Sequence, residues 1–366
     1  MLRYYSRNQF FLSQIGIWPY QSKMIKILLP CFIISSLLSI LVPQVFLLYN
    51  SWGDMNMTVE VMDEHWRLFH GKCELHILKR YANIGQLITK YYSVYINIFV
   101  VLFLSIPLIP KILDVVIPLN QSRPFIYVLE GDWGVDKEKY YYPIMLHCYL
   151  AIIVGTRCLV NIDTMYVVCV LHGCSLFNAI GIRLENILSK AKLMQHEQIM
   201  SLEYAVIKEY YSEDYHEMIA CLKKHQLAIK YIYMLDSTFK HATFLILFLN
   251  VMILSLVGLQ LINKFGQTQE VIRFGCIVMG SITHLLSMCL PGQLLLDRSI
   301  EIFDKAYSAQ WYMFSLKTTK LLSILLHRSL VPCTLSAANM YIMSMTTFSS
   351  VMQTAMSYFT TFLSVS

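Results

Sequence analysis

The chain of 366 residues is 56% hydrophobic and 14% charged, and its formal net charge at pH 7 is +6. Soluble domains carry roughly 25% charged residues, so this composition argues against a water-soluble domain and indicates a single polytopic membrane domain over residues 1–366. The basic residues lie mostly between apolar stretches, which is typical of cytoplasmic loops and argues against a nucleic-acid partner.

The N-terminal residues 1–24 are basic, with Arg3, Arg7 and Lys23 before the first apolar stretch. That stretch is longer than the apolar part of a signal peptide, so residues 1–24 are predicted to form a cytoplasmic N-terminus. The ten cysteines contain no CxxC pair and mostly lie inside apolar runs. They are predicted to be packing residues, and we expect no disulfide framework, metal site or cofactor.

Six stretches are long and apolar enough to be predicted as membrane spans. They are residues 27–53, 91–110, 140–182, 241–263, 274–296 and the uncharged terminal stretch that follows Arg328. The predicted fold is therefore an all-α polytopic membrane helical bundle. Within residues 140–182, Arg157 and Asp163 interrupt the apolar run. One long helix with both residues facing other helices or water is preferred, and placement near the outer interface is the alternative.

Two loops between the spans carry helical patterns that predict packing below the membrane. In residues 183–240 the apolar positions Met218, Leu222, His225, Ile229 and Ile232 fall on one helical face. In residues 305–328 the same holds for Tyr307, Trp311, Phe314, Thr318, Leu321 and Leu325.

Two glycosylation sequons begin at Asn56 and Asn120, after the first and second predicted spans. Both would be extracellular only if these two spans ran in the same direction, which requires a return crossing between them. Residues 54–90 hold ten charged side chains, too many for a crossing, so we expect residues 54–80 to form a surface or cytoplasmic helix. Either the sequons are accidental or a span is absent.

Several motifs resemble those of the insect odorant receptor family. Tyr307, Trp311 and Tyr312 precede an Arg-Ser-x-x-Pro block at 328–332, a turn-like segment at 334–337 and Ser357-Tyr358-Phe359 in the last helix. Residues 163–165 and 172–174 resemble the family's fourth helix, and residues 225–226 resemble a cytoplasmic segment. The resemblance covers essentially the whole chain and is greatest to hymenopteran members, ants in particular.

The resemblance implies a seven-span subunit of a ligand-gated, non-selective cation channel with its N-terminus inside. Such a tuning subunit forms a heterotetramer with the odorant co-receptor (Orco) in the plasma membrane of olfactory sensory neurons, and binds a small volatile ligand within the outer half of the membrane. The last helix, residues 329–366 here, would line the pore. Residues 183–240 and 297–328 would form the cytoplasmic helical anchor.

The chain departs from the family in two places. Relatives carry a second span between segments like Trp52-Gly53-Asp54 and Asp63-Glu64-His65-Trp66, which are almost adjacent here. The resemblance therefore implies the loss of one span, which would resolve the sequon conflict. In relatives an aliphatic residue also closes the pore by dewetting two positions after Tyr-Phe, where this chain has Thr361. The candidate pore residues are Gln353, Ser357, Thr361 and Ser364.

A pocket for an apolar volatile ligand should be mostly aromatic and aliphatic with few polar groups. Tyr92, Tyr95, Phe99 and Phe103 recur at spacings of three and four on one predicted helix, so they face one way. These four residues, with Thr156 and His284, are the candidate ligand contacts. Simple helix packing is the alternative for each of them, and His284 fits a hydrogen bond to a neighbouring helix.

No constellation of catalytic residues is found, so an enzyme is not expected. Two other receptor classes remain as alternatives. A gustatory receptor shares the fold, but the Arg-Ser-x-x-Pro block favours the odorant branch. A G-protein-coupled receptor is disfavoured by the basic N-terminus, predicted to lie inside, and by the uncharged C-terminal stretch.

Overall fold

The structure is a computed structural model that describes residues 57–117, 127–128, 136, 138–198, 204–263, 266, 268–308 and 311–365. The chain divides into two compact units, residues 1–61 and residues 62–366. The described part of the first unit is the helical segment 57–61. All elements below belong to the second unit.

The second unit is almost entirely helical, which confirms the predicted fold class. After helical residues 62–68, its long helices are α3 (Lys72–Ser105), α5 (Tyr141–Gln198), α6 (Tyr204–Asn263) and α7 (Thr268–Tyr307). Shorter helices are η2 (Ile106–Leu108), α4 (Ile109–Val116), η3 (Trp311–Met313), α8 (Leu316–Ser329) and α9 (Met345–Val365). The only strands in the described ranges are β1 (Ser336–Ala337) and β2 (Tyr341–Ile342), paired antiparallel.

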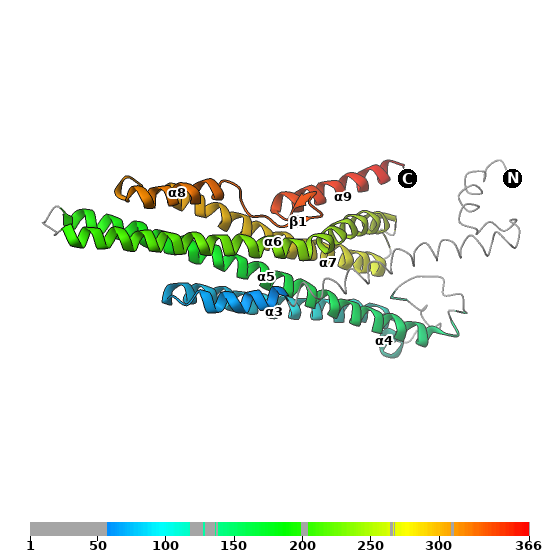
Figure 1. The fold of residues 1–366 in the computed structure, drawn as a ribbon. Helices are drawn as coiled ribbons and strands as arrows, with labels where there is room; N and C mark the ends of the chain where they lie inside the picture. The colour runs from blue at the N-terminus through cyan, green and yellow to red at the C-terminus, as the bar shows by residue number, and fades with distance from the viewer. Residues whose placement is uncertain are drawn as a thin grey trace, which may run out of the picture. The chain divides into compact units, whose positions relative to one another are not determined.

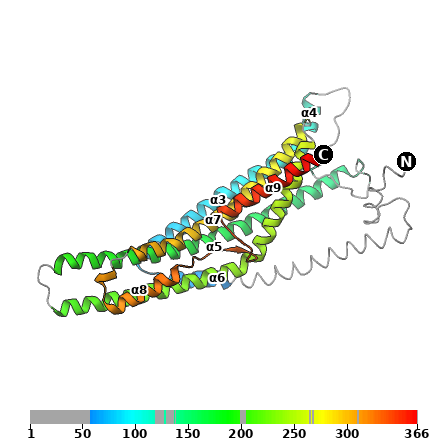
Figure 2. The same cartoon turned by 90° about the horizontal axis from the view of Figure 1, so that it is seen from above.

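Successive long helices run in opposite directions along the bundle (Figures 1 and 2). Arg183 of α5 bonds Glu74 at the start of α3, and Tyr149 of α5 donates to Leu104 near the end of α3, so the two helices are antiparallel. In the figures α6 and α9 run in the same sense as α3, and α7 runs in the opposite sense. α5 packs against α3, α6 and α7, and α9 packs chiefly against α6.

Four helices of the described chain are long and apolar enough to cross a membrane: Lys72–Asp114, Tyr141–Ile187, Asp214–Leu261 and Glu270–Tyr307. They contain four of the six predicted spans. The predicted span at 27–53 lies outside the described residues. The terminal stretch does form a helix, α9, of 21 residues, but it is not among the four.

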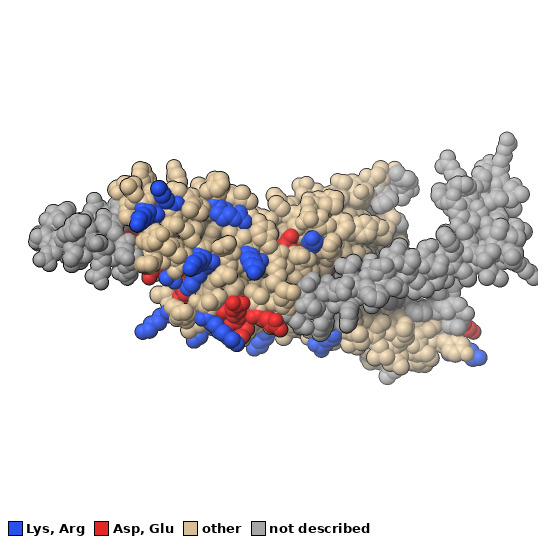
Figure 3. Space-filling view, viewed as in Figure 1, with Lys and Arg blue, Asp and Glu red and all other residues tan. Residues whose placement is uncertain are grey.

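Charged side chains gather at one end of the face shown in Figure 3. Lys and Arg lie over α8, the neighbouring part of α6 and the start of α3, whereas most of the surface over α9 and the nearby part of α7 is uncharged. An uncharged belt beside a charged end is the pattern of a helical bundle that crosses a membrane. The belt also agrees with the membrane placement predicted from composition.

The segment 54–80, predicted as a surface or cytoplasmic helix, contributes to two helices where the structure describes it. Residues 57–68 form a short helix, and residues 72–80 are the first turns of the long helix α3. The helix α3 ends at Ser105, two residues before Pro107, whose missing amide hydrogen cannot continue the helical hydrogen bonding. The chain then continues through η2 and α4.

At the basic end, three helices meet through ion pairs around Glu74. Its side chain is 8% exposed and bonds Lys224 of α6 at 2.6 Å and Arg183 of α5 at 3.0 Å. Arg183 also pairs with Glu217 at 3.1 Å. Nearby, the buried His65 stacks on His172, with 3.3 Å between His65 Nδ1 and His172 Nε2. Burial lowers the pKa of His65, although the Glu64 carboxylate opposes that shift.

The predicted helical stripes are partly confirmed. Met218, His225, Ile229 and Ile232 are buried on one face of α6. The stripe over 305–328 is wrong at its start, because α7 ends at Tyr307 and α8 begins only at Leu316. Ser315 caps α8 by accepting a hydrogen bond from the Thr318 amide. Tyr307 and Trp311 are consequently exposed, whereas Phe314, Thr318 and Leu325 are buried.

A small hairpin connects α8 to α9, within the segment 329–366 that the resemblance implied to be the last helix. Its turn holds Ala338 and Asn339 at positive φ, and the Met340 amide donates to the Ala337 carbonyl. The turn resembles type I′, which joins paired strands tightly. Asp236 of α6 accepts hydrogen bonds from the amide and hydroxyl of Ser336, so the hairpin is fixed to the bundle.

The N-terminus of α9 is held by α7. The Met345 amide donates to the side-chain oxygen of Gln293 at 3.2 Å, and Gly292 packs against Met343 so closely that a methyl group there would overlap the Met343 carbonyl. Pro291 lies inside α7 immediately before this contact. The base of α9 is therefore attached both to α6, through the hairpin, and to α7.

Most cysteines whose surroundings the structure describes are packing residues, as predicted: Cys148, Cys169, Cys174, Cys221, Cys289 and Cys333 are buried. Cys73, in contrast, is exposed. No group of three or more His, Cys, Asp or Glu side chains suited to a metal ion is found in the ranges that the structure describes.

Candidate functional site

The predicted aromatic face of α3 packs against α5 and α7. Tyr92 donates a hydrogen bond to the carboxylate of Asp163 on α5 at 2.5 Å. One turn later, the Tyr95 hydroxyl lies 3.3 Å from the Thr283 hydroxyl on α7. The ring of Phe99 lies 6.2 Å from that of Tyr95 and contacts α7 beside Gly280. These three residues therefore share one face, as the spacing predicted.

Asp163 is the centre of a polar network that joins four helices. It is fully buried and contacts Tyr92 of α3 and, at 3.2 Å, the Nε2 atom of His284 on α7. The other ring nitrogen of His284 lies 3.4 Å from the side-chain amide nitrogen of Asn250 on α6. An amide nitrogen can only donate, so Nδ1 is the acceptor and Nε2 carries the proton that it donates to Asp163. His284 thus links α7 to both α5 and α6.

This network shows what His284 and Asp163 contact inside the predicted spans. His284 is hydrogen-bonded to neighbouring helices, as predicted. Residues 140–182 form part of one long helix, α5, and Asp163 faces other helices, which confirms the preferred placement. Arg157, by contrast, is exposed, and no hydrogen bond or ion pair of its side chain is found in the part of the chain that the structure describes.

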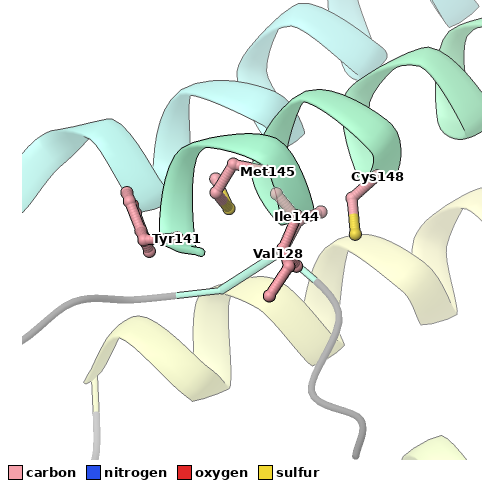
Figure 4. Close-up of a cluster of buried hydrophobic side chains, with 5 residues drawn as sticks. All are labelled: Val128, Tyr141, Ile144, Met145 and Cys148. Carbon is pink, nitrogen blue, oxygen red and sulfur yellow. The ribbon is translucent and has the colours of Figure 1, made fainter. Parts of the chain in front are cut away.

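Phe103 and Thr156 lie apart from the network. Phe103 packs against a separate cluster at the far end of α5 (Figure 4). Four of its side chains come from the first turns of α5 and one from the preceding segment: Tyr141, Ile144, Met145, Cys148 and Val128. Thr156 is half-buried on α5, and no contact joins it to the other candidates in the described region.

Reasoning from the sequence missed several residues of this site. Asp163 was recognised only as an ionisable residue inside a span, and Thr283, Asn250 and Gly280 were not singled out. An intramembrane acid and an intramembrane histidine are each signals of a polar partner. Their pairing depends on how α5 and α7 pack, which spacing within one helix cannot show.

The candidate pore residues Gln353, Ser357, Thr361 and Ser364 are all exposed on α9. Their spacing of four, four and three places them on one face. The Ser357 and Thr361 hydroxyls donate to carbonyls one turn earlier, so each keeps its oxygen lone pairs outward. The opposite face, with Val351 and Ala355, is buried.

The two sequon residues, Asn56 and Asn120, lie outside the described residues. Glycosylation at either therefore stays a prediction, as does the predicted loss of a span, because the segment 27–56 is also outside the described part.

Comparisons with known proteins agree with this arrangement. The sequence model of the family described as 7tm Odorant receptor matches residues 51–356. Among curated proteins, odorant receptor Or2 of Anopheles gambiae is 26% identical over 144 residues, which is 39% of this chain. The aligned part spans only 38% of the length of that relative.

Two solved structures share the fold. They are the insect olfactory receptor OR5 of Machilis hrabei, alone and in complex with eugenol, each with a TM-score of 0.60 at 12% identity. Each comparison covers 100% of this chain and 98% or 99% of the receptor. Since the family's sequence model also matches well over half of the residues, the chain belongs to the odorant receptor family of membrane proteins, and it is a receptor rather than an enzyme.

Proposed function

We propose that this chain is the odorant-binding subunit of a ligand-gated, non-selective cation channel that it forms with the odorant co-receptor. It acts in the perception of smell, in the plasma membrane of olfactory sensory neurons. The observation that carries the channel function is the polar face of α9. Gln353, Ser357, Thr361 and Ser364 lie exposed on a helix whose other residues are mostly apolar.

Such a face would be costly against lipid and is suited to water. Hydroxyls and amides that face hydrocarbon lose their hydrogen bonds to water, whereas a hydrated pore supplies them. Within the residues that the structure describes, α9 packs against the bundle through its other side, where Val351 and Ala355 are buried and Phe359 packs on Gly258 of α6. The polar face would thus meet the same helix of neighbouring subunits around a central pore.

For ligand recognition we propose the contact region between α3 and α7. Tyr92, Tyr95, Phe99 and His284 lie close together there, next to the buried Asp163. Aromatic rings with a few polar groups suit a small volatile molecule. Phe103 and Thr156 would belong to the periphery of this region. The anchor would be the basic end of the bundle, which includes residues 183–240 and 297–328.

A cysteine scan of α9 tests the pore assignment. The variants Gln353→Cys, Ser357→Cys and Thr361→Cys are assembled with the co-receptor and treated with a charged, membrane-impermeant thiol reagent. We expect modification at all three positions, because a hydrated pore admits the reagent. Leu150→Cys, on the 55% exposed position of α5, is the matched control and should stay unmodified in lipid.

Where the complex conducts, modification of the three α9 positions should also block ligand-evoked current. Modification of Leu150→Cys but not of the α9 variants would show that α9 faces lipid, and the pore assignment would then be wrong.

A further inference from the structure

A cavity lies between α6 and α9, away from the contact region of α3 and α7. Its volume is about 480 Å³. One wall is formed by α6 residues that include Phe248, Met252 and Leu256, and the other by the α9 residues Ser350 and Thr354 with their neighbours. The tip of the hairpin closes one end. None of the six candidate ligand residues lines this α6–α9 cavity.

The lining is uncharged and mainly apolar, with hydroxyls along the α9 side. The Thr354 and Thr347 hydroxyls donate to backbone carbonyls of their own segment, at 2.8 Å and 2.5 Å, and therefore face the cavity as acceptors. The Ser350 and Tyr358 hydroxyls make no hydrogen bond within the part of the chain that the structure describes. These two can both donate and accept, so the cavity offers hydrogen bonds but no ion pair.

The cavity opens sideways through the apolar surface of α6. Phe248, Met252 and Leu256 are 54%, 43% and 51% exposed, and they belong to a segment apolar enough to cross the membrane. A molecule that partitions into the hydrocarbon region of the bilayer could therefore enter without crossing water. A charged molecule would gain no partner inside, and its loss of hydration would oppose entry.

The cavity also adjoins the helix to which the pore is assigned. Ser350, Thr354 and Tyr358 repeat every fourth residue, and so do Gln353, Ser357 and Thr361 of the polar face. At 3.6 residues per turn, the two faces lie about 60° apart around the helix axis. An occupant of the cavity would thus contact α9 on the side next to its polar face.

We propose that the α6–α9 cavity is a second ligand site. It takes an uncharged, mainly aliphatic or aromatic molecule with one hydroxyl group, which dissolves in the bilayer and enters from it. The body of the molecule packs against Phe248 and Met252, and its hydroxyl bonds Ser350 or Tyr358. The volume falls within the 300–1,000 Å³ range of small-molecule pockets. An effect of such binding on the pore would rest on the proposed function, whereas the binding itself does not.

Photolabelling of the full chain in lipid nanodiscs tests the site. The probe is a medium-chain aliphatic alcohol that carries a diazirine, and adducts are mapped by mass spectrometry. We expect saturable labelling of peptides from α6 and α9 around Met252 and Thr354, which an excess of the unmodified alcohol removes. Absence of saturable adducts on these peptides would overturn the proposal.

A second arm distinguishes a free alcohol from the tail of a membrane lipid. The nanodiscs here contain a phosphatidylcholine with a diazirine in its acyl chain, and the unmodified alcohol is added as competitor. If the alcohol prevents the lipid from forming adducts in the cavity, the site binds the free alcohol in preference to a lipid tail. Lipid adducts that persist at saturating alcohol would show a lipid-filled groove, and the proposal would be wrong.

Two matched variants locate the binding. Ser350→Phe should fill the cavity and abolish the saturable labelling, whereas Ser349→Phe, one residue away, exposed and outside the lining, should leave it unchanged. Retention of labelling in a folded Ser350→Phe protein would contradict the site. If that variant does not fold, the adduct map of the unsubstituted protein decides the question by itself.

Discussion

The substitution Glu74→Gln should destabilise the bundle by removing the shared partner of two cations. The carboxylate of Glu74 is nearly buried and lies 2.6 Å from the Lys224 ammonium and 3.0 Å from the Arg183 guanidinium. Glutamine keeps the size of the side chain but not its charge. Lys224, whose side chain is only 14% exposed, then loses its carboxylate partner in a site with little water.

The size of the effect follows from these contacts. Removal of one member of a buried ion pair costs roughly 3–5 kcal/mol. Arg183 keeps Glu217 and is 24% exposed, which reduces its share. We therefore expect a loss of about 2–4 kcal/mol, which would lower the midpoint of thermal unfolding by several degrees.

The assay follows the reaction of buried thiols with a fluorogenic maleimide during heating of the detergent-solubilised protein. Cys169, Cys221 and Cys289 are buried and become reactive on unfolding. The control is Asp63→Asn, which breaks the ion pair between Asp63 and Arg67. Because the Asp63 side chain is 64% exposed, this change should cost at most about 1 kcal/mol. Equal midpoints for the Glu74 and Asp63 variants would refute the reasoning.

Three further outcomes are expected. Tyr92→Phe removes a hydrogen-bond donor to Asp163 and should lower the free energy of unfolding by about 1–3 kcal/mol in the same thermal assay. The control Tyr91→Phe, at a 67% exposed position, should have no effect, and equal shifts for the two variants would contradict the network. Gly292→Ala in α7 should destabilise the contact with the base of α9 by about 1–3 kcal/mol, because the added methyl group would overlap Met343. Gly275→Ala, also in α7, meets open space and should be neutral or stabilising. Co-expressed with the co-receptor, the chain as written should give little or no odorant-evoked current. Insertion of the second span of a close relative should restore the current. Robust current without this insertion would show that the predicted loss of a span is wrong or is tolerated.

The long helices could be predicted from the sequence because their apolar runs are long and contain few charged residues. The predicted span at 241–263 even ends at the same residue as α6, Asn263. The aromatic face of α3 was also predictable, since a spacing of three and four depends only on the geometry of one helix. The residues that this face contacts on other helices were not predictable from the sequence. Asp163 and His284, for example, are hydrogen-bonded although they lie 121 positions apart in the chain.

The hairpin before α9 left almost no signal in the sequence. Its strands have two residues each, too few for an alternating pattern, and its turn has Ala338 and Asn339 where glycine is the usual choice. It is formed by contacts made elsewhere, above all the bonds of Ser336 to Asp236. The break between α7 and α8 did leave a signal: Ser315 precedes Thr318 in the arrangement of a helix cap, which outweighs the apparent stripe through Tyr307 and Trp311.

The attachment of α9 is firmest at its base, so its tip can tilt more than its base. Met345 is bonded to α7 and follows the fixed hairpin, whereas beyond the buried Ala355 the helix packs on α6 through Phe359, which contacts Gly258. From Met345 to Thr361 the helix rises about 24 Å, so a tilt of about 5° at the base would move Thr361 by about 2 Å. That displacement is comparable to the diameter of a dehydrated cation, while the base would hardly move. Spin labels at positions 346 and 364 should therefore report unequal distance changes on ligand binding, and equal changes would show that α9 shifts as a whole.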